Sequence, residues 1–517
     1  MLGELWSFQG KYRTLHLTWF AFFLTFVVWF NLAPLATTVK ADFGLSVPQM
    51  RALALCNVAL TVPARVLIGM LLDKYGPRLT YSCLLVFAAI PCLLFACAQD
   101  FQQLVVARLL LSIVGAGFVI GIRMVAEWFP PREIGLAQGI YGGWGNSGSS
   151  FAFLSLVALA GLFSFGGGVD VGGAILNWRA AIACTGIVAA IYGAIYYFSV
   201  TDTPPGKVYQ RPAKSAGLEV TSVRDFWGSL GMNVPIAASL VLIAWNLRKV
   251  SVLDARGYQL SLLLVLIWFG FQAWGICRTN WDLLCGRKTY PKEDRYSFRQ
   301  VAMLELTYVV NFGSELAVVS MLPAFCESTF GLPKHIAALV AASYPLVNLV
   351  GRPAGGLLSD RMGSRKTTMA VLTLVMGVGF LAMSMIRPGS FSGPSGLVLV
   401  SLLLMLCALP RSASAGATFA LVPLIKRRVT GQIAGMVGAY GNVGSVFYLA
   451  IYSQLPAWMG GDAKEPSAAI LAASNSAFFQ ILGVASLVVG CLCYVFLREP
   501  KGSFAEDSTD SAALAGG

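Results

Sequence analysis

Two arginines lie inside hydrophobic segments, where a permanently charged side chain needs a partner or a ligand. Arg65 and Arg352 each precede a loop aspartate, Asp73 and Asp360, by eight residues. Eight residues of helix rise about 12 Å, so both guanidinium groups are expected toward the interior of a membrane. No acidic residue shares either helix segment. Two related cations without an obvious counterion suit an anion that both of them bind, and the fork of an arginine matches a planar oxyanion.

Acidic residues elsewhere leave a structural alternative open, because salt bridges to Glu127 or Glu315 would also account for the buried arginines. Glu315 itself lies within a hydrophobic segment, and an acid in that setting is by default a functional residue. It is therefore a candidate for proton coupling, while a role as counterion for Arg123 or Arg411 stays open. Glu127 and Glu305 compete with it for any proton role.

A glycine-asparagine motif occurs twice, as GIYGGWGNSGS at 139–149 and GMVGAYGNVGS at 435–445. At helical spacing the glycines expose backbone on the face that also presents the asparagine amide. Either copy alone would suggest close helix packing, but the repetition with asparagine in the same place favours contact with a substrate. The candidate residues are Asn146, Asn442, Gly142, Gly145, Gly438 and Gly441.

A second repeated motif, GMLLDKYGPR and GLLSDRMGSRK, places glycines, an aspartate and an arginine in short polar loops. The glycines permit tight turns, and each aspartate can pair with a cation or with the end of a neighbouring helix. This arrangement predicts a gating or structural role that is independent of substrate. The residues are Gly69, Asp73, Gly76, Arg78, Gly356, Asp360, Gly363 and Arg365.

The repeated motifs require two similar halves, because both pairs recur in the same order at nearly the same offset. The first half, 1–200, holds six apolar stretches near 15–37, 48–72, 79–97, 102–129, 133–161 and 174–200, and six more fit in 299–497. Each stretch can span a membrane as a helix. The sequence predicts an all-α membrane protein with pseudo-twofold symmetry. A polar tail, expected to be disordered and cytoplasmic, covers 498–517.

A central linker, 201–298, separates the halves and contains two further apolar runs at about 233–247 and 258–277. If they form a transmembrane hairpin, the chain has fourteen spans and not twelve. The first run is short for a span, and Arg248, Lys249 and Arg256 would lie on the outer side. An interfacial or re-entrant pair therefore stays an alternative.

Composition narrows the classes of function. Hydrophobic residues make up 57% of the 517 residues and charged residues 12%, as expected of a chain that lies largely in lipid. The net charge of +13 gathers in short loops, which the positive-inside rule explains without nucleic acid. With only two histidines, an imidazole metal site or a Ser-His-Asp triad is nearly excluded. We expect no enzyme, no metal and no cofactor.

The loop motifs resemble those of the major facilitator superfamily, and the two glycine-asparagine segments resemble the paired motifs of its nitrate/nitrite porters, most closely those of the cyanobacterial and plant type. The resemblance implies a major facilitator fold in which Arg65 and Arg352 clamp nitrate. It also implies that aromatic rings enclose the ion, at Phe118, Tyr308 and Phe312. Tyr308 and Phe312 are four residues apart and share a helix face.

The expected function is secondary active transport of nitrate and nitrite by alternating access, with proton-coupled uptake. Nitrate/nitrite exchange, a carrier of another small or phosphorylated anion, and an anion sensor that does not transport are the alternatives. The expected partners are these anions, protons and the lipid bilayer. We expect a monomer in the plasma (inner) membrane with both termini cytoplasmic.

Overall fold

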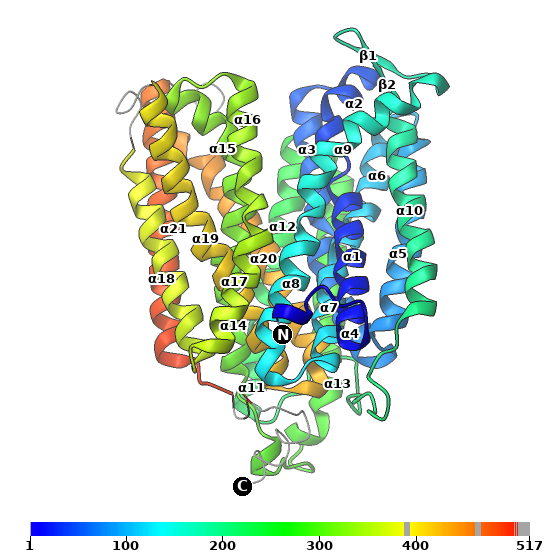
Figure 1. The fold of residues 1–517 in the computed structure, drawn as a ribbon, viewed down its shortest axis with the longest axis vertical. Coiled ribbons are helices and arrows are strands. Elements are labelled where there is room, and N and C mark those ends of the chain that lie inside the picture. The colour runs from blue at the N-terminus through cyan, green and yellow to red at the C-terminus, as the bar shows by residue number, and fades with distance from the viewer. Residues whose placement is uncertain (1, 387–392, 461–466, 501, 503, 505–517) are drawn as a thin grey trace. The chain divides into compact units, whose positions relative to one another are not determined.

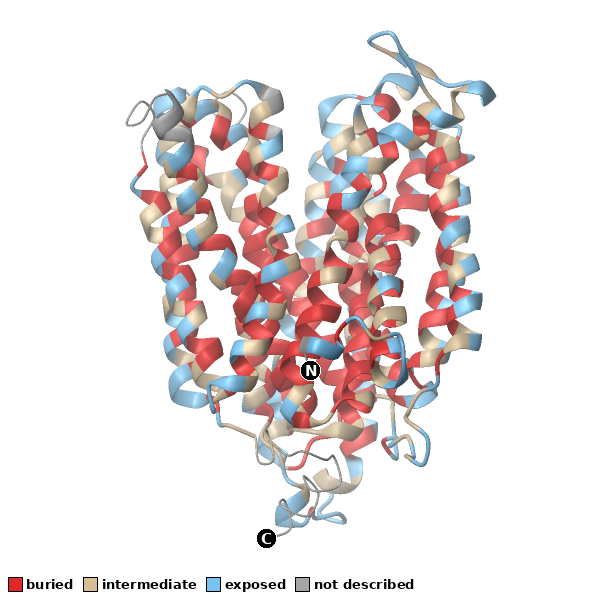
Figure 2. Cartoon of the chain, viewed as in Figure 1, coloured by how far each residue is buried: buried red, intermediate tan, exposed pale blue. Residues whose placement is uncertain are grey.

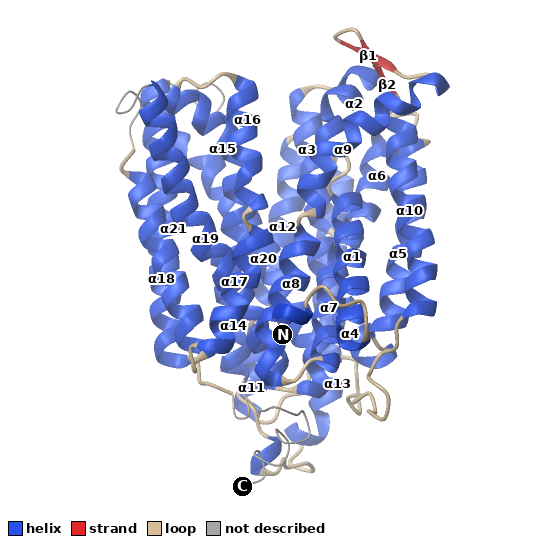
Figure 3. Ribbon diagram, viewed as in Figure 1, coloured by secondary structure: helices blue, strands red, loops and turns tan. Residues whose placement is uncertain are grey.

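The computed structural model describes residues 2–386, 393–460, 467–500, 502 and 504. These residues fold almost entirely into helices, with a small hairpin of strands (Figure 3). Most of the predicted polar tail lies outside the described residues.

The helices up to the central linker are α1 (Gly10–Trp29), α2 (Ala36–Phe43), α3 (Val47–Ala59), α4 (Thr61–Tyr75), α5 (Pro77–Ala96), α6 (Phe101–Ser112), α7 (Gly117–Trp128), α8 (Ile134–Asn146), α9 (Gly148–Leu162) and α10 (Trp178–Ser199). Strands β1 (Val169–Val171) and β2 (Ala174–Leu176) precede α10. The linker contains α11 (Val223–Gly231), α12 (Val234–Lys249) and α13 (Ala255–Leu284).

The remaining helices are α14 (Phe298–Tyr308), α15 (Ser314–Phe330), α16 (Lys334–Leu346), α17 (Asn348–Arg361), α18 (Arg365–Ser384), α19 (Gly393–Ile425), α20 (Thr430–Trp458) and α21 (Ala468–Phe496). A π-helical turn, Val309–Gly313, joins α14 to α15. Short 3-10 turns lie at Leu2–Glu4, Ala33–Leu35, Ile113–Ala116, Pro131–Glu133, Phe163–Gly166, Lys292–Asp294 and Arg427–Val429.

Among the described residues, 13 helical segments are long and apolar enough to cross a membrane. Two of them are the predicted hairpin of the linker, Val223–Lys249 and Ala255–Leu284. Within it, α12 packs against α13 and also against α3 and α4. Exposed apolar side chains such as Leu263, Leu264 and Ile267 line α13, as expected of a helix that faces lipid. The prediction of 12 to 14 membrane helices is confirmed.

The chain divides into two compact units that do not follow the sequence halves strictly. Unit 1 contains Met1–Pro130, Ile140–Phe298 and Lys426–Ala439, and therefore the start of α20. Unit 2 contains Pro131–Gly139, Arg299–Ile425 and Tyr440–Gly517, and therefore the start of α8. Within each unit, buried residues follow the helix faces that meet other helices (Figure 2).

The first and the sixth of the predicted spans differ from the observed elements. The first is a broken helix, because the turn around Pro34 separates α1 from α2, and Gly44 ends α2 at a φ of 61°. The sixth begins later than predicted, since the residues before it form the antiparallel hairpin of β1 and β2. Gly172 and Gly173 form its turn with φ values of 65° and 89°, which favour glycine. The hairpin lies beside α2 and α9 (Figure 1).

Candidate functional site

Arg65 lies on α4, fully buried within unit 1. Its Nη1 donates to the carbonyl oxygen of Gly438 at 2.5 Å, and its Nε and Nη2 donate to the carbonyl oxygen of Gly115 at 3.3 and 3.1 Å. Rings of Trp29 and Phe118 lie 6.0 and 5.8 Å from the guanidinium carbon. These acceptors are neutral dipoles, so they orient the guanidinium fork without cancelling its charge.

Close packing around Arg65 explains why glycine stands at Gly115 and at Gly435, one turn before the acceptor Gly438. Gly115 lies in the 3-10 turn between α6 and α7, where a Cβ would lie 2.7 Å from the Trp29 ring. Gly438 lies on α20, which packs directly on α4: a Cβ at Gly435 would lie 2.5 Å from the Arg65 carbonyl oxygen. The repeated motif thus presents a carbonyl to Arg65. Nothing in the spacing of the sequence pointed to Gly115 or Trp29.

Phe118 lies in the same unit as Gly142, Gly145 and Asn146 of the first glycine-asparagine motif. Phe118 is 1% exposed and stacks on Tyr141, with ring centroids 6.1 Å apart. A Cβ at Gly145 would overlap the ring of Phe22, so this glycine admits α1 against α8. Gly142 is buried on α8, one turn before Asn146, the residue at which α8 ends. Arg65, Phe118 and this motif therefore belong to one buried region.

Arg352, on α17 in unit 2, has a different environment. Its Nη2 lies 3.8 Å from a carboxylate oxygen of Glu315, and its Nε donates to the Asn348 amide oxygen at 3.4 Å. Arg411 forms an ion pair with the same Glu315, and the Asn348 amide nitrogen donates to that carboxylate at 2.6 Å. Tyr344 covers Arg411, with its ring 5.1 Å from the guanidinium carbon.

The contacts of Glu315 and Glu127 show which arginines form salt bridges with these two acids. Glu315 is shared by Arg411 and Arg352, while Glu127 pairs with Arg123 at 2.8 Å and with Arg427 at 3.1 Å. The two repeated arginines are therefore unequal, because a carboxylate lies near Arg352 whereas the acceptors of Arg65 within unit 1 are carbonyls.

Tyr308 precedes the π-helical turn of unit 2, and Phe312 lies within it. Their rings stack with centroids 5.3 Å apart and planes inclined by 6°, so the two residues share a face as their spacing indicates. π-turns inside α-helices are frequent at functional sites. A Cβ at Gly441 would lie 2.7 Å from the Tyr308 ring, so this motif glycine makes room for the aromatic pair.

The side-chain amides of the two motif asparagines are buried and contain polar atoms without a hydrogen bond to a described residue. Asn146 is 3% exposed and Asn442 is 0% exposed. The amide nitrogen of Asn146 and both polar atoms of Asn442 make no hydrogen bond to any residue that the structure describes. A buried amide in this condition costs about 1–3 kcal/mol. These atoms are therefore suited to meet a polar ligand.

The loop aspartates each cap the start of a helix. Asp73 accepts hydrogen bonds from the backbone N–H groups of Gly431 and Gln432, at 2.8 and 2.9 Å, at the start of α20. Asp360 accepts from Gly135 and Leu136, at 2.9 and 2.7 Å, at the start of α8. A carboxylate at a helix N-terminus satisfies free donors and complements the helix dipole. Both aspartates lie at the end of a neighbouring helix, and Asp360 also pairs with a cation, Arg365.

The motif glycines make this capping possible. A Cβ at Gly69 would lie 2.5 Å from the Gly431 carbonyl oxygen, and one at Gly356 would lie 3.1 Å from the Leu136 nitrogen. Gly76 and Gly363 follow the helices with φ values of 90° and 69°.

The motif arginines differ between the copies. Arg365 pairs with Asp360 at 2.5 Å, whereas Arg78 donates to the carbonyl oxygen of Tyr197 at 2.7 Å and lies over the ring of that tyrosine.

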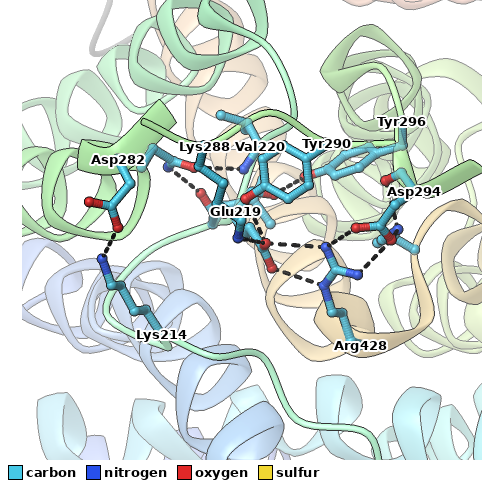
Figure 4. A network of polar contacts seen from close by, with 12 residues as sticks. Lys214, Glu219, Val220, Asp282, Lys288, Tyr290, Asp294, Tyr296 and Arg428 are labelled. Carbon is cyan, nitrogen blue, oxygen red and sulfur yellow. Dashed lines mark hydrogen bonds and ion pairs between the residues drawn. The ribbon is translucent and has the colours of Figure 1, made fainter. Parts of the chain in front are cut away.

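Ion pairs between side chains join the central linker to the loop before α20. The sequence did not indicate this feature. Arg428 donates to Glu219 at 2.9 and 3.1 Å and to Asp294 at 2.7 and 2.9 Å (Figure 4). Tyr290 donates to Glu219 at 2.7 Å. Burial alone would raise the pKa of Glu219, but the hydrogen bonds from Arg428 and Tyr290 outweigh it and lower that pKa below its ordinary value.

A small apolar cluster supports the same part of the linker. It contains Val220, Phe226 and Ile276. Asn280 of α13 holds the intervening chain, since it accepts from the backbone of Val220 at 2.9 Å and donates to that of Leu218 at 2.9 Å. The linker is thus a folded part of unit 1 next to the helix that carries the second glycine-asparagine motif.

Comparison with known proteins places these features in a family. The family model described as the Major Facilitator Superfamily matches residues 18–278 and 304–514. The "Nitrate/nitrite transporter NrtP" of Picosynechococcus sp. is 57% identical over 98% of this chain and 96% of its own length, and that of Nostoc punctiforme is 50% identical with the same coverage.

More distant proteins share the architecture. The "Probable nitrate/nitrite antiporter NarK1" of Thermus thermophilus is 28% identical over 87% of this chain and 86% of its own length. The crystal structure of the human organic anion transporter MFSD10 superposes with a TM-score of 0.60 at 12% identity, covering 94% of this chain and 100% of that one.

Proposed function

Because this chain belongs to the Major Facilitator Superfamily, we propose that it carries nitrate and nitrite across a membrane as a secondary active transporter. The chain is an integral, multi-pass membrane protein, and its described residues include 13 apolar helical segments that are long enough to span. Relatives that are 57% and 50% identical are named as nitrate/nitrite transporters, and they match nearly the whole chain.

The observation that carries the proposal is the pair of buried asparagine amides in the repeated motif. Asn146 and Asn442 hold polar atoms without a hydrogen bond to any described residue, and a small oxyanion would accept from their N–H groups. Such a ligand removes the free-energy penalty of burying N–H donors without a hydrogen bond, and it gives each amide a specific partner. An uncharged or apolar substrate would remove less of that cost.

Arg65 and Arg352 supply the attraction for the anion. A guanidinium presents several N–H donors in one plane, which matches the oxygens of a planar ion. Arg65 is oriented by Gly115 and Gly438, and Arg352 by Asn348 and Glu315. The resemblance to the nitrate/nitrite porters supports Phe118, Tyr308 and Phe312 as the ring faces that cover the flat ion.

Coupling to protons is the proposed source of energy. Bringing one negative charge inward against a negative-inside potential costs about 2.3 kcal/mol per 100 mV. Of the two roles considered for Glu315, its contacts favour that of counterion for Arg411 over that of proton carrier. Exchange of nitrate for nitrite is the second candidate mechanism, since a relative is named as an antiporter of these ions.

The setting completes the proposal. The protein acts as a monomer in the plasma (inner) membrane with both termini cytoplasmic, an orientation that the basic loop residues favour. The loop motifs, with Asp73 and Asp360 at helix starts, act as gating elements.

Uptake of labelled nitrate into liposomes that contain the purified protein tests the function. We expect saturable uptake that nitrite inhibits and that an inward proton gradient drives above equilibrium. Uptake only with nitrite trapped inside would select exchange. Inhibition by phosphorylated anions but not by nitrite would select another substrate. Nitrate binding without any uptake would select the sensor.

A further inference from the structure

Glu305 is a buried acid that the proposed anion site does not use. It lies on α14 in unit 2 with an exposed fraction of 0%. Neither of its carboxyl oxygens makes a hydrogen bond to any residue among those that the structure describes. This distinguishes Glu305 from Glu315 and Glu127, whose carboxylates pair with arginines.

Within the part of the chain that the structure describes, no cation is hydrogen-bonded to Glu305. On α20 the ionisable neighbour is Tyr440, which interacts electrostatically with Glu305. On α21 the thiol of Cys493 is hydrogen-bonded to Thr307. The cation that α19 brings into this unit, Arg411, is paired with Glu315. On α14 itself, Arg299 lies over the ring of Phe496 of α21.

These surroundings favour the neutral carboxylic acid. Burying an ionised carboxylate without a partner costs far more than burying the protonated acid, which is only a polar group. Such a group releases its proton only when the protein moves so that water or a cation reaches it. The protonation of Glu305 is therefore tied to the conformation of the helices around it.

The position of Glu305 also links it to the proposed anion site. Glu305 precedes Tyr308 by one helical turn, so the two side chains lie on neighbouring parts of one helix surface. The Tyr308 ring packs on Gly441, the residue before Asn442. A rearrangement of the aromatic pair around an anion would therefore move the helix that carries Glu305.

We propose that Glu305 is the proton-binding site that couples transport to the proton gradient, an inference that rests on the proposed function. Its carboxylate takes a proton from water on the outer side. The proton stays on the buried acid while the anion crosses, and then passes to water on the inner side. One proton thus moves with the anion, and no bond other than O–H forms or breaks.

The test compares two assays on Glu305→Gln in liposomes. Glutamine copies the shape of the neutral acid but cannot release a proton, so the fold and the anion site should persist. We expect Glu305→Gln to lose accumulation of labelled nitrate driven by an inward proton gradient, and to keep exchange of internal nitrite for external nitrate at the parental rate. Glu305→Asp should regain proton-driven accumulation. Glu327→Gln, a half-exposed acid of α15, is the matched control and should retain both activities.

The outcomes separate the inference from the function on which it rests. Proton-driven accumulation by Glu305→Gln would overturn the inference while leaving the proposed nitrate transport intact. Loss of exchange by a Glu305→Gln protein that still unfolds at the parental temperature would also overturn the inference. If Glu305→Gln does not fold, the inference is tested by infrared difference spectra of the parent protein with and without nitrate. A carboxylic acid band that changes when nitrate binds and shifts in Glu305→Asp supports the inference, and its absence overturns it. Failure of the parent protein in both assays would refute the proposed function instead.

Discussion

Replacing Glu315 by glutamine removes the negative charge that two buried arginines share. The carboxylate pairs with Arg411, lies 3.8 Å from Arg352, and accepts from Asn348 at 2.6 Å. Glutamine has a similar shape and can still accept from the asparagine, so the change isolates the charge. Removing one partner of a buried ion pair costs about 3–5 kcal/mol, because the other charge stays buried. We expect Glu315→Gln to lose about that much unfolding free energy.

A second substitution checks the cause. Arg411→Met in the Glu315→Gln background removes the charge left without its partner. The double variant should therefore be about 0.5–3 kcal/mol more stable than the sum of the losses of the two single variants predicts. Unfolding in detergent can be followed by a thiol-reactive dye, since Cys407 is buried near the cluster on α19. Glu327→Gln, on the same helix as Glu315 but partly exposed, is the control and should change stability by at most about 0.5 kcal/mol. Glu315→Gln with parental stability would refute the counterion role.

Two further predictions follow from the packing of α20 and from the linker. Gly435→Ala should lower stability by about 1–3 kcal/mol, since its Cβ would lie 2.5 Å from the Arg65 carbonyl oxygen. Gly438→Ala, whose Cβ would lie 3.3 Å from the Arg65 side chain, should unfold near the parental temperature; equal behaviour of the two variants would contradict the packing. The pKa of Glu219 is lowered by Arg428 in the folded state, so its stabilising effect is present above the unfolded pKa of about 4.3 and is lost as pH falls through the folded value. The parent protein should unfold at a higher temperature than Glu219→Gln at pH 7, and this difference should vanish in acid; a difference independent of pH would refute the assignment.

Much of the architecture was predictable because it repeats. The paired loop motifs set the register of the two halves. An arginine eight residues before each loop aspartate was therefore expected far from the loop, toward the interior of the membrane. The structure buries both Arg65 and Arg352. The spacing of Tyr308 and Phe312 likewise predicted a shared face, although not the π-helical turn that follows Tyr308 and contains Phe312.

Other features depend on contacts between residues far apart in the chain, which spacing does not encode. The carbonyl of Gly115 reaches Arg65 because the helix changes to a 3-10 turn there. Arg411 finds Glu315 across helices, so the two repeated arginines differ although their motifs agree. The two apolar runs of the linker were visible in the sequence, but not that Arg428 ties the linker to the start of α20 through two carboxylates.

The most direct test of the central claim is the initial rate of labelled nitrate uptake by Arg65→Lys in liposomes. Lysine keeps the charge but cannot reproduce the three donor contacts to Gly115 and Gly438, or a two-pronged contact to an anion. Loss of one hydrogen bond to a charged group, about 1.5–3 kcal/mol, corresponds to about a tenfold or greater fall in apparent affinity. Arg179→Lys, at a partly exposed ion pair with Asp42, is the control. We predict that Arg65→Lys loses nitrate uptake while Arg179→Lys retains it; parental uptake by Arg65→Lys would contradict the assignment of the anion site.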